Sequence, residues 1–154
     1  MRGMKEHHYA AHLVWDGDNT TDYTTYSRSH RAVIESKPEI RLTADPAFRG
    51  DADTHNPEDL FLTAISSCHM LSYLALCAKY RINVLSYEDR ATGVMQEDGK
   101  GGGKFVSVTL HPVVTISDPE QIERATKLHE RAHEQCFIAA SCSVPIHHQA
   151  EVRT

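Results

Sequence analysis

The alternation of apolar and polar residues divides the first third of the chain into three short strands. Residues 7–15 and 22–34 are rich in Tyr, Thr, Val and Trp, and the turn-forming segment Asp16-Gly17-Asp18-Asn19 separates them. A third run, residues 39–43, again alternates apolar and polar positions. We therefore predict a hairpin followed by a third antiparallel strand.

A long helix is predicted after the loop that follows these strands. Asn56-Pro57-Glu58-Asp59 combines a capping asparagine, a proline at the first helical position and acidic residues in the first turn. From there apolar residues recur every three or four positions until about Tyr80. The predicted buried face consists of Phe61, Ala64, Ile65, Cys68, Leu71, Ser72 and Ala75.

The rest of the chain predicts two further strands, a second helix and a last strand. Residues 84–95 and 105–116 are the strands, joined by a glycine-rich hairpin loop that lacks the Gly-Lys-Ser/Thr ending of phosphate-binding loops. The second helix begins at Asp118-Pro119-Glu120, and residues 143–152 form the last strand. The apolar line of the second helix is Ile122, Ala125, Leu128 or His129, Ala132 and Cys136. The order βββ-α-ββ-α-β predicts a single α+β domain over residues 1–154, with antiparallel sheets and two main helices.

Composition and charge exclude several classes of function. The 154 residues contain 16 Lys+Arg and 21 Asp+Glu, a formal net charge of −5, and no basic cluster exceeds two or three residues, so we expect no nucleic-acid partner. We find no signal-peptide core and no run near the roughly 18 apolar residues of a membrane helix. These features predict a cytoplasmic protein that forms one compact domain or one swapped half of a dimer.

The four cysteines are the first candidates for catalytic or metal-binding residues. In a cytoplasmic chain they are thiols or metal ligands rather than a disulfide framework. Cys68 and Cys136 each fall on the apolar face of a helix, so their sulfurs are expected to meet, whereas Cys77 is predicted on roughly the opposite side of its helix. The alternative is that all four cysteines are small buried hydrophobic residues.

A reactive cysteine needs a cation that stabilises its thiolate. A helix dipole acts only over the first turn, and Cys68 lies about twelve residues beyond the predicted cap. The candidate cations are Arg28 and Arg31 on the second strand and, less well placed, His69 beside Cys68. The alternative for the two arginines is a solvated strand surface.

A second kind of site is indicated by His129-Glu130-Arg131-Ala132-His133, which matches the His-Glu-x-x-His zinc pattern. Two imidazoles would share one helix face, with Glu130 as the base of a hydrolase. Against this hypothesis, Arg131 places a cation inside the pattern, and a third ligand must come from elsewhere. A zinc-dependent hydrolase therefore stays an alternative function.

Three motifs together resemble the OsmC/Ohr family, and more closely its OsmC-like branch. They are Asn56-Pro57-Glu58-Asp59-Leu60 followed by Ser66-Ser67-Cys68, then Ala132-His133-Glu134-Gln135-Cys136, and Tyr26-Ser27-Arg28-Ser29-His30-Arg31. The resemblance covers most of the chain. It implies an intertwined homodimer of α+β subunits that reduces organic hydroperoxides, with a lipoyl-type dithiol as reductant and without cofactor or metal.

The same resemblance implies roles for four residues. Cys68 is the peroxidatic cysteine, Cys136 the resolving cysteine that forms a disulfide with it, Arg28 the activating cation and Glu58 the carboxylate that orients Arg28. The sequence departs from the family at Phe137, His69 and Cys142: the family commonly has proline after the resolving cysteine and an apolar residue after the peroxidatic one, and Cys142 is an additional thiol. These departures bear on the substrate range and on the identity of the resolving partner. A non-catalytic module that keeps the fold and binds small molecules is a third hypothesis.

The spacing of Glu58 and Cys68 bears on assembly. Ten residues of helix place them about 15 Å apart, too far for one guanidinium to contact both. Either a second subunit supplies the glutamate, which we favour, or the start of the helix folds back.

Overall fold

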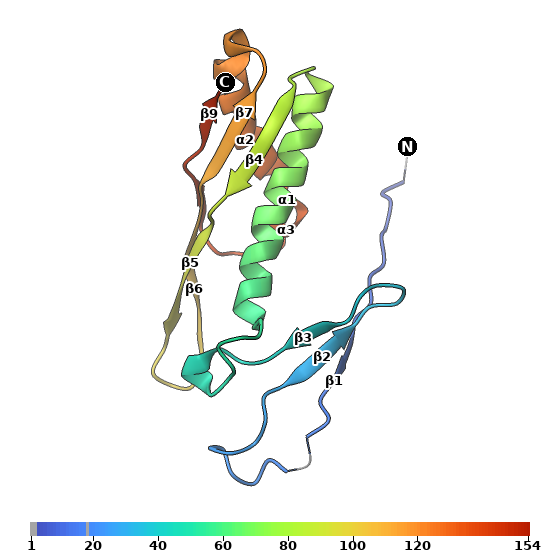
Figure 1. Ribbon diagram of the computed structural model, residues 1–154, viewed down its shortest axis with the longest axis vertical. Helices are drawn as coiled ribbons and strands as arrows, with labels where there is room; N and C mark the ends of the chain where they lie inside the picture. Colours follow the sequence, from blue (N-terminus) through green and yellow to red (C-terminus); the bar gives the residue numbers. More distant parts are fainter. Residues whose placement is uncertain (1–2, 18) are drawn as a thin grey trace. The chain divides into compact units, whose positions relative to one another are not determined.

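The computed structural model describes residues 3–17 and 19–154, so Asp18 of the predicted turn lies outside the described residues. The chain divides into two compact units, Met1–Leu60 and Phe61–Thr154, which are described separately. Figure 1 labels the elements along the chain.

The first unit contains one antiparallel three-stranded sheet in the order β1-β2-β3. Its strands are β1 (His12–Val14), β2 (His30–Val33) and β3 (Ile40–Leu42), so the predicted hairpin and third strand are confirmed. The predicted extents of the first two strands are wrong, because β2 starts at residue 30 rather than 22. The Asp22 carboxylate accepts a hydrogen bond from the Thr24 backbone at 2.8 Å, which holds this segment in a turn. Arg28 therefore lies in a loop.

A short 3-10 helix, η1 (Pro46–Phe48), precedes α1 (Pro57–Lys79). The backbone N–H of Asp59 donates to the Asn56 side-chain oxygen at 2.9 Å, and that of Asn56 donates to the Asp59 carboxylate at 3.3 Å. This reciprocal capping satisfies backbone donors that the first turn leaves free. The predicted bounds of this helix are thus confirmed to within one residue.

In the second unit, each of the two predicted long strands is divided in two. The first becomes β4 (Val84–Asp89) and β5 (Thr92–Glu97), and the second becomes β6 (Gly103–Leu110) and β7 (Pro112–Ile116). β4 pairs with β7 and β5 with β6, both antiparallel, so the hairpin is confirmed. The division falls at Asp89, whose carboxylate accepts from the His111 backbone N–H at 2.7 Å, and at Pro112, which has no N–H to donate.

The last predicted strand is also two strands, β8 (Ile146–His148) and β9 (Glu151–Arg153). They pair parallel with β6 and β7 respectively, which corrects the prediction of purely antiparallel sheets. The physical reason is the connection: a chain that leaves a strand, passes through a helix and returns to the same sheet can arrive parallel. The fold is therefore α+β with mixed sheets.

The connection contains η2 (Pro119–Gln121), α2 (Ile122–Gln135) and the one-turn helix α3 (Phe137–Ala140). The larger core packs α1 and α2 together with β7 (Figure 1). Its buried residues are Tyr73, Leu76, Cys77, Ile82, Val114, Ile116, Ala125, Leu128 and Ala132. The predicted apolar line of the second helix is thus confirmed as its buried side. A smaller core is formed by Ile65, Val108 and Leu110.

The predicted buried face of α1 is only partly correct: Ile65 is buried and Phe61 packs against the smaller core, but Leu71 and Ala75 are exposed. Leu71 is 60% exposed, while His69 and Tyr73 are buried together with Leu76 and Cys77. A count of apolar residues misses His69 and Tyr73, whose rings are buried while His69 Nε2 pairs with His129 and the Tyr73 hydroxyl donates to the Ala125 carbonyl. Cys77 packs with residues of α2, which overturns the expectation that it points away from that helix.

The prediction that no segment approaches a membrane helix also needs correction. An 18-residue window of α1 has a mean hydropathy of 1.6, so α1 is long and apolar enough by that test. Ser, Thr and Cys residues break the continuous apolar run that the sequence analysis looked for, but they lower the mean hydropathy of the helix only slightly. The core helix of a soluble protein satisfies the same criterion. Only 28% of this window is buried within the chain, which leaves a largely apolar surface uncovered.

Candidate active site

The thiols of Cys68 and Cys136 meet in the second unit. Cys68 lies in α1 and is half-buried, whereas Cys136 is only 1% exposed. The two cysteines are neighbours, since Cys68 is among the groups that raise the pKa of Cys136, and both are free thiols. The geometry therefore provides one sulfur with access to solvent and a second, enclosed sulfur next to it.

Cys136 does not continue the second helix, as the sequence suggested, but separates α2 from α3. Its backbone is extended (φ −74°, ψ 111°), and its sulfur accepts a hydrogen bond from the Ala139 N–H at 3.4 Å. Burial, together with the contact to Cys68, raises the pKa of Cys136 to about 11. Cys136 is consequently a protonated thiol at neutral pH.

Arg28 is held by the loop that precedes β2. Its guanidinium donates to the backbone carbonyls of Tyr26 at 2.5 Å and Tyr23 at 2.6 Å. It also lies 3.5 Å from the centroid of the Tyr26 ring, a cation–π contact. Among the described residues no carboxylate pairs with Arg28, so its charge is available to a thiolate or an anion.

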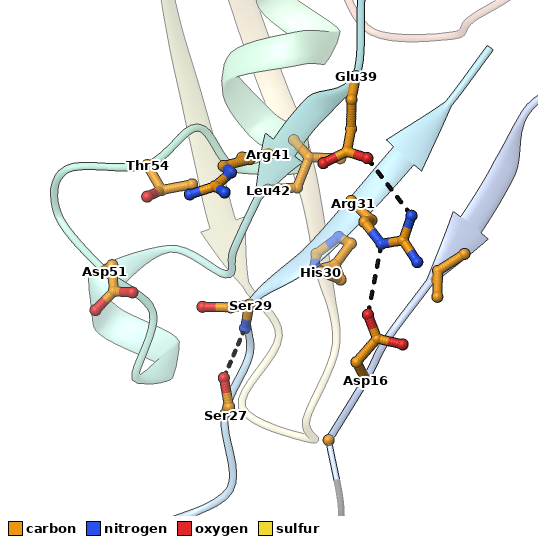
Figure 2. Close-up of a pocket in the computed structure, with 12 residues that line it drawn as sticks. Asp16, Ser27, Ser29, His30, Arg31, Glu39, Arg41, Leu42, Asp51 and Thr54 are labelled. Carbon is orange, nitrogen blue, oxygen red and sulfur yellow. Dashed lines mark hydrogen bonds and ion pairs between the residues drawn. The ribbon is translucent and has the colours of Figure 1, made fainter. Parts of the chain in front are cut away.

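Arg31, the second candidate cation, is already paired. Its guanidinium lies 3.4 Å from Asp16 and 3.5 Å from Glu39, and it lines a cavity of about 470 Å³ in the first unit (Figure 2). Two carboxylates beside one guanidinium compensate its charge. The geometry thus favours Arg28 over Arg31 as an activating cation.

Glu58 lies in the first turn of α1, and one of its carboxylate oxygens is buried without a hydrogen-bond partner among the described residues. Residues 57–79 form one continuous helix, so Glu58 and Cys68 are separated by about 15 Å along its axis. The alternative of a helix start that folds back is therefore wrong. Arg28 and Glu58 belong to the first unit, and their association with Cys68 stays a prediction.

His69, which follows Cys68 in α1, forms a buried pair with His129 that the sequence analysis missed. His69 Nε2 lies 3.0 Å from His129 Nδ1, and the Tyr73 ring stacks on His129 with centroids 3.9 Å apart. Burial lowers the pKa of His69 to about 4 and that of His129 to about 3, so both are neutral at physiological pH. The spacing of Ile65, His69, Tyr73 and Leu76 is the helical signal from which this face is recognisable.

The arrangement of these histidines does not support the zinc hypothesis. The described residues hold no group of three or more His, Cys, Asp and Glu side chains placed to bind a metal ion. His129 is fully buried and engaged with His69, and the exposed Glu130 pairs with His148 at 3.1 Å. The His-Glu-x-x-His pattern is here part of the packing between α2 and its neighbours.

Comparison with known proteins supports the family suggested by the motifs. The sequence profile of the OsmC-like protein family matches residues 50–151. The structure of an OsmC-like protein of unknown function from Vibrio cholerae superimposes with a TM-score of 0.84 at 30% identity, covering 95% of this chain and 100% of that one. The chain belongs to the OsmC family. The expected OsmC-like α+β fold is thereby confirmed.

More distant OsmC-family structures share the fold. An organic hydroperoxide resistance protein from Elizabethkingia anophelis has 19% identity and a TM-score of 0.72, covering 100% of this chain and 99% of that one. Another, from Legionella pneumophila, has 16% identity and a TM-score of 0.71, covering 98% and 100%. A search of curated proteins found no match.

The buried histidines of this OsmC-family protein make its stability sensitive to acid. Because their pKa values are lower in the folded chain, the unfolded chain binds more protons as the pH falls below about 6.5. We expect the free energy of unfolding to decrease between pH 6.5 and 5, by at most about 1.4 kcal/mol per pH unit for each histidine. Urea unfolding across this range measures the slope.

Two variants test the assignment to histidine. His69→Gln keeps a side-chain donor toward His129 and should reduce the slope, whereas His147→Gln, at an exposed position, should leave it unchanged. An equal pH dependence of the free energy of unfolding in wild type and His69→Gln would contradict the assignment to the buried histidines.

Proposed function

We propose that this OsmC-family protein is a thiol peroxidase that reduces organic hydroperoxides through Cys68. The observation that supports this proposal is that the half-buried Cys68 neighbours the enclosed, protonated Cys136. A sulfenic acid formed at Cys68 would meet a second thiol without any large movement. Family membership agrees with this chemistry, since some structures of the same fold are organic hydroperoxide resistance proteins.

The proposed reaction has two steps. The Cys68 thiolate attacks one peroxide oxygen, a sulfur–oxygen bond forms as the oxygen–oxygen bond breaks, and the departing alkoxide takes a proton to become an alcohol. Cys136 is positioned to give that proton, which leaves its own thiolate beside the new sulfenic acid. The Cys136 thiolate then attacks the Cys68 sulfur, and hydroxide leaves and is protonated to water as the disulfide forms. An external dithiol of lipoyl type returns two electrons and two protons.

Arg28 and Glu58 are proposed to activate Cys68. The dipole of α1 does not reach Cys68, so the thiolate needs a side-chain cation. Arg28 has no carboxylate partner among the described residues, and its planar guanidinium suits both a thiolate and a peroxide oxygen. The buried, unpartnered oxygen of Glu58 is the acceptor that would orient this arginine.

A homodimer is the assembly that the exposed surface supports. Most of the apolar α1 is uncovered in a single chain, and Leu71 on that helix is 60% exposed. Covering such a surface with a second copy removes apolar area from water. A second copy would also supply a Glu58 that is not restricted by the 15 Å spacing along α1.

The proposed activity is tested by steady-state consumption of tert-butyl hydroperoxide with dihydrolipoic acid as reductant. We expect turnover that requires both compounds and that persists after treatment with a metal chelator. Consumption no faster than in protein-free buffer would contradict the proposal and favour the non-catalytic module. Loss of activity on chelation would favour the zinc hypothesis.

A further inference from the structure

The helix α3 carries a cysteine next to each of its ends, and both sulfurs bind the same residue. Cys136 precedes α3 and accepts a hydrogen bond from Ala139 N–H at 3.4 Å. Cys142 follows it, and its thiol donates to the Ala139 carbonyl at 3.6 Å. The proposed function uses the first of these thiols and leaves Cys142 without a role.

Cys142 also lines a cavity of about 510 Å³ in the second unit. The walls are mainly apolar, and the amine of one lysine is the only charged group among them: Phe61, Lys104, Phe105, Val106, Val144 and Pro145. Phe61 precedes Cys68 by seven residues, which is about two turns, so the two share one side of α1. The cavity therefore begins on the side of α1 that carries the peroxidatic thiol.

We propose that Cys142 is a second resolving thiol that takes over the disulfide from Cys68. The inference rests on the proposed peroxidase function. The Cys142 thiolate attacks the Cys136 sulfur of the Cys68–Cys136 disulfide, a Cys136–Cys142 bond forms, and Cys68 leaves as a thiolate. The proton of Cys142 passes to solvent, and the exchange needs no further oxidant or reductant. The external dithiol then reduces Cys136–Cys142 through the cavity.

Two features favour this direction of exchange. A thiol of raised pKa is a poor leaving group, and the pKa of Cys136 is raised, so attack on Cys136 releases Cys68. Cys136 is 1% exposed and difficult for an external dithiol to reach, whereas Cys142 is half-buried at a cavity wall. Transfer thus moves the disulfide toward the reductant and regenerates the Cys68 thiolate.

Cys142 follows Cys136 by six residues that include α3, about 9 Å at the rise of a helix, whereas a disulfide needs Cα atoms within about 7 Å, so the exchange requires α3 to open. α3 is a single turn of four residues, and an isolated turn is only marginally stable. Its first residue, Phe137, is 83% exposed, so opening this end uncovers little additional apolar surface.

The test follows the disulfides over time after one equivalent of tert-butyl hydroperoxide. Trypsin leaves Cys68 on peptide 50–79 and both Cys136 and Cys142 on peptide 132–153, so the first disulfide joins two peptides and the second lies within one. Peptide 50–79 also holds Cys77, and the experiment is therefore done in Cys77→Ser. We expect the linked peptides to form first and then to decay as the internal disulfide appears.

Cys142→Ser in the same background provides the comparison. We expect its Cys68–Cys136 disulfide to form at an unchanged rate and then to persist, and steady-state turnover with dihydrolipoic acid to fall at least fivefold. Ser143→Ala is the matched control at the other neighbouring exposed position, because the Ser141 hydroxyl donates to the Phe137 carbonyl at 2.7 Å and holds α3 closed. Persistence of Cys68–Cys136 in the presence of Cys142, or turnover of Cys142→Ser within twofold of its parent, would overturn the relay. Failure of the peroxidase proposal is distinguishable, because then no Cys68–Cys136 disulfide forms at all.

Discussion

Cys68→Ser is expected to lower the consumption of organic hydroperoxide by a factor on the order of 10³, because it removes the nucleophile of the first step. The loss should be accompanied by unchanged secondary structure and thermal stability, since Cys68 is only half-buried and lies outside the main core. Steady-state assays with tert-butyl hydroperoxide and dihydrolipoic acid measure the rate.

Cys77→Ser is the matched control on the same helix. Cys77 is buried in the core with Tyr73 and Leu76, and burial raises the pKa of its thiol, so it is an inert packing residue. Its replacement should leave the rate near that of wild type and lower stability modestly, by about 1 kcal/mol. If Cys77→Ser lost activity as completely as Cys68→Ser while remaining folded, the assignment of Cys68 would be wrong.

Glu58→Ala is expected to inactivate the homodimer and to be complemented by an inactive Cys68→Ser chain. If Glu58 of one subunit serves Cys68 of the other, a mixed dimer contains one site with both residues intact. Refolding the two variants together in equal amounts should then give roughly one quarter of the wild-type activity, because half of the dimers are mixed and each has one complete site.

Two controls accompany the mixing experiment. Each variant refolded alone must stay inactive, and Asp59→Ala, which removes a capping carboxylate at the neighbouring position, should retain activity with reduced stability. No recovery in the mixture, or a monomer at micromolar concentration by sedimentation, would refute a shared site.

The elements of this fold were largely predictable from local chemistry. Asn56 and Asp59 cap α1 through their own side chains, so four consecutive residues are enough to predict where the helix starts. The bounds of the strands were less predictable, because the division at Asp89 depends on an N–H donated by His111, 22 residues later. The parallel pairing of β8 and β9 likewise depends on where the chain returns after α2.

The candidate site was predictable in part. Cys68 and Cys136 were found by spacing, and in the structure they are neighbours, with Cys68 among the groups that raise the pKa of Cys136. The buried side of α1 was predicted only in part, because the burial of His69 depends on a partner for its Nε2 that His129 supplies from α2. A pattern that counts histidine as polar shifts the predicted face away from His69 and Tyr73, and it places Cys77 on the wrong side.

The central claim is that peroxide converts Cys68 and Cys136 into a disulfide by way of a Cys68 sulfenic acid. It is tested most directly in the Cys77→Ser, Cys142→Ser protein, where only these two thiols remain. After one equivalent of tert-butyl hydroperoxide, intact mass spectrometry should show a loss of about 2 Da, and tryptic mapping should join peptides 50–79 and 132–153. An unchanged mass with both thiols still open to alkylation would contradict the account.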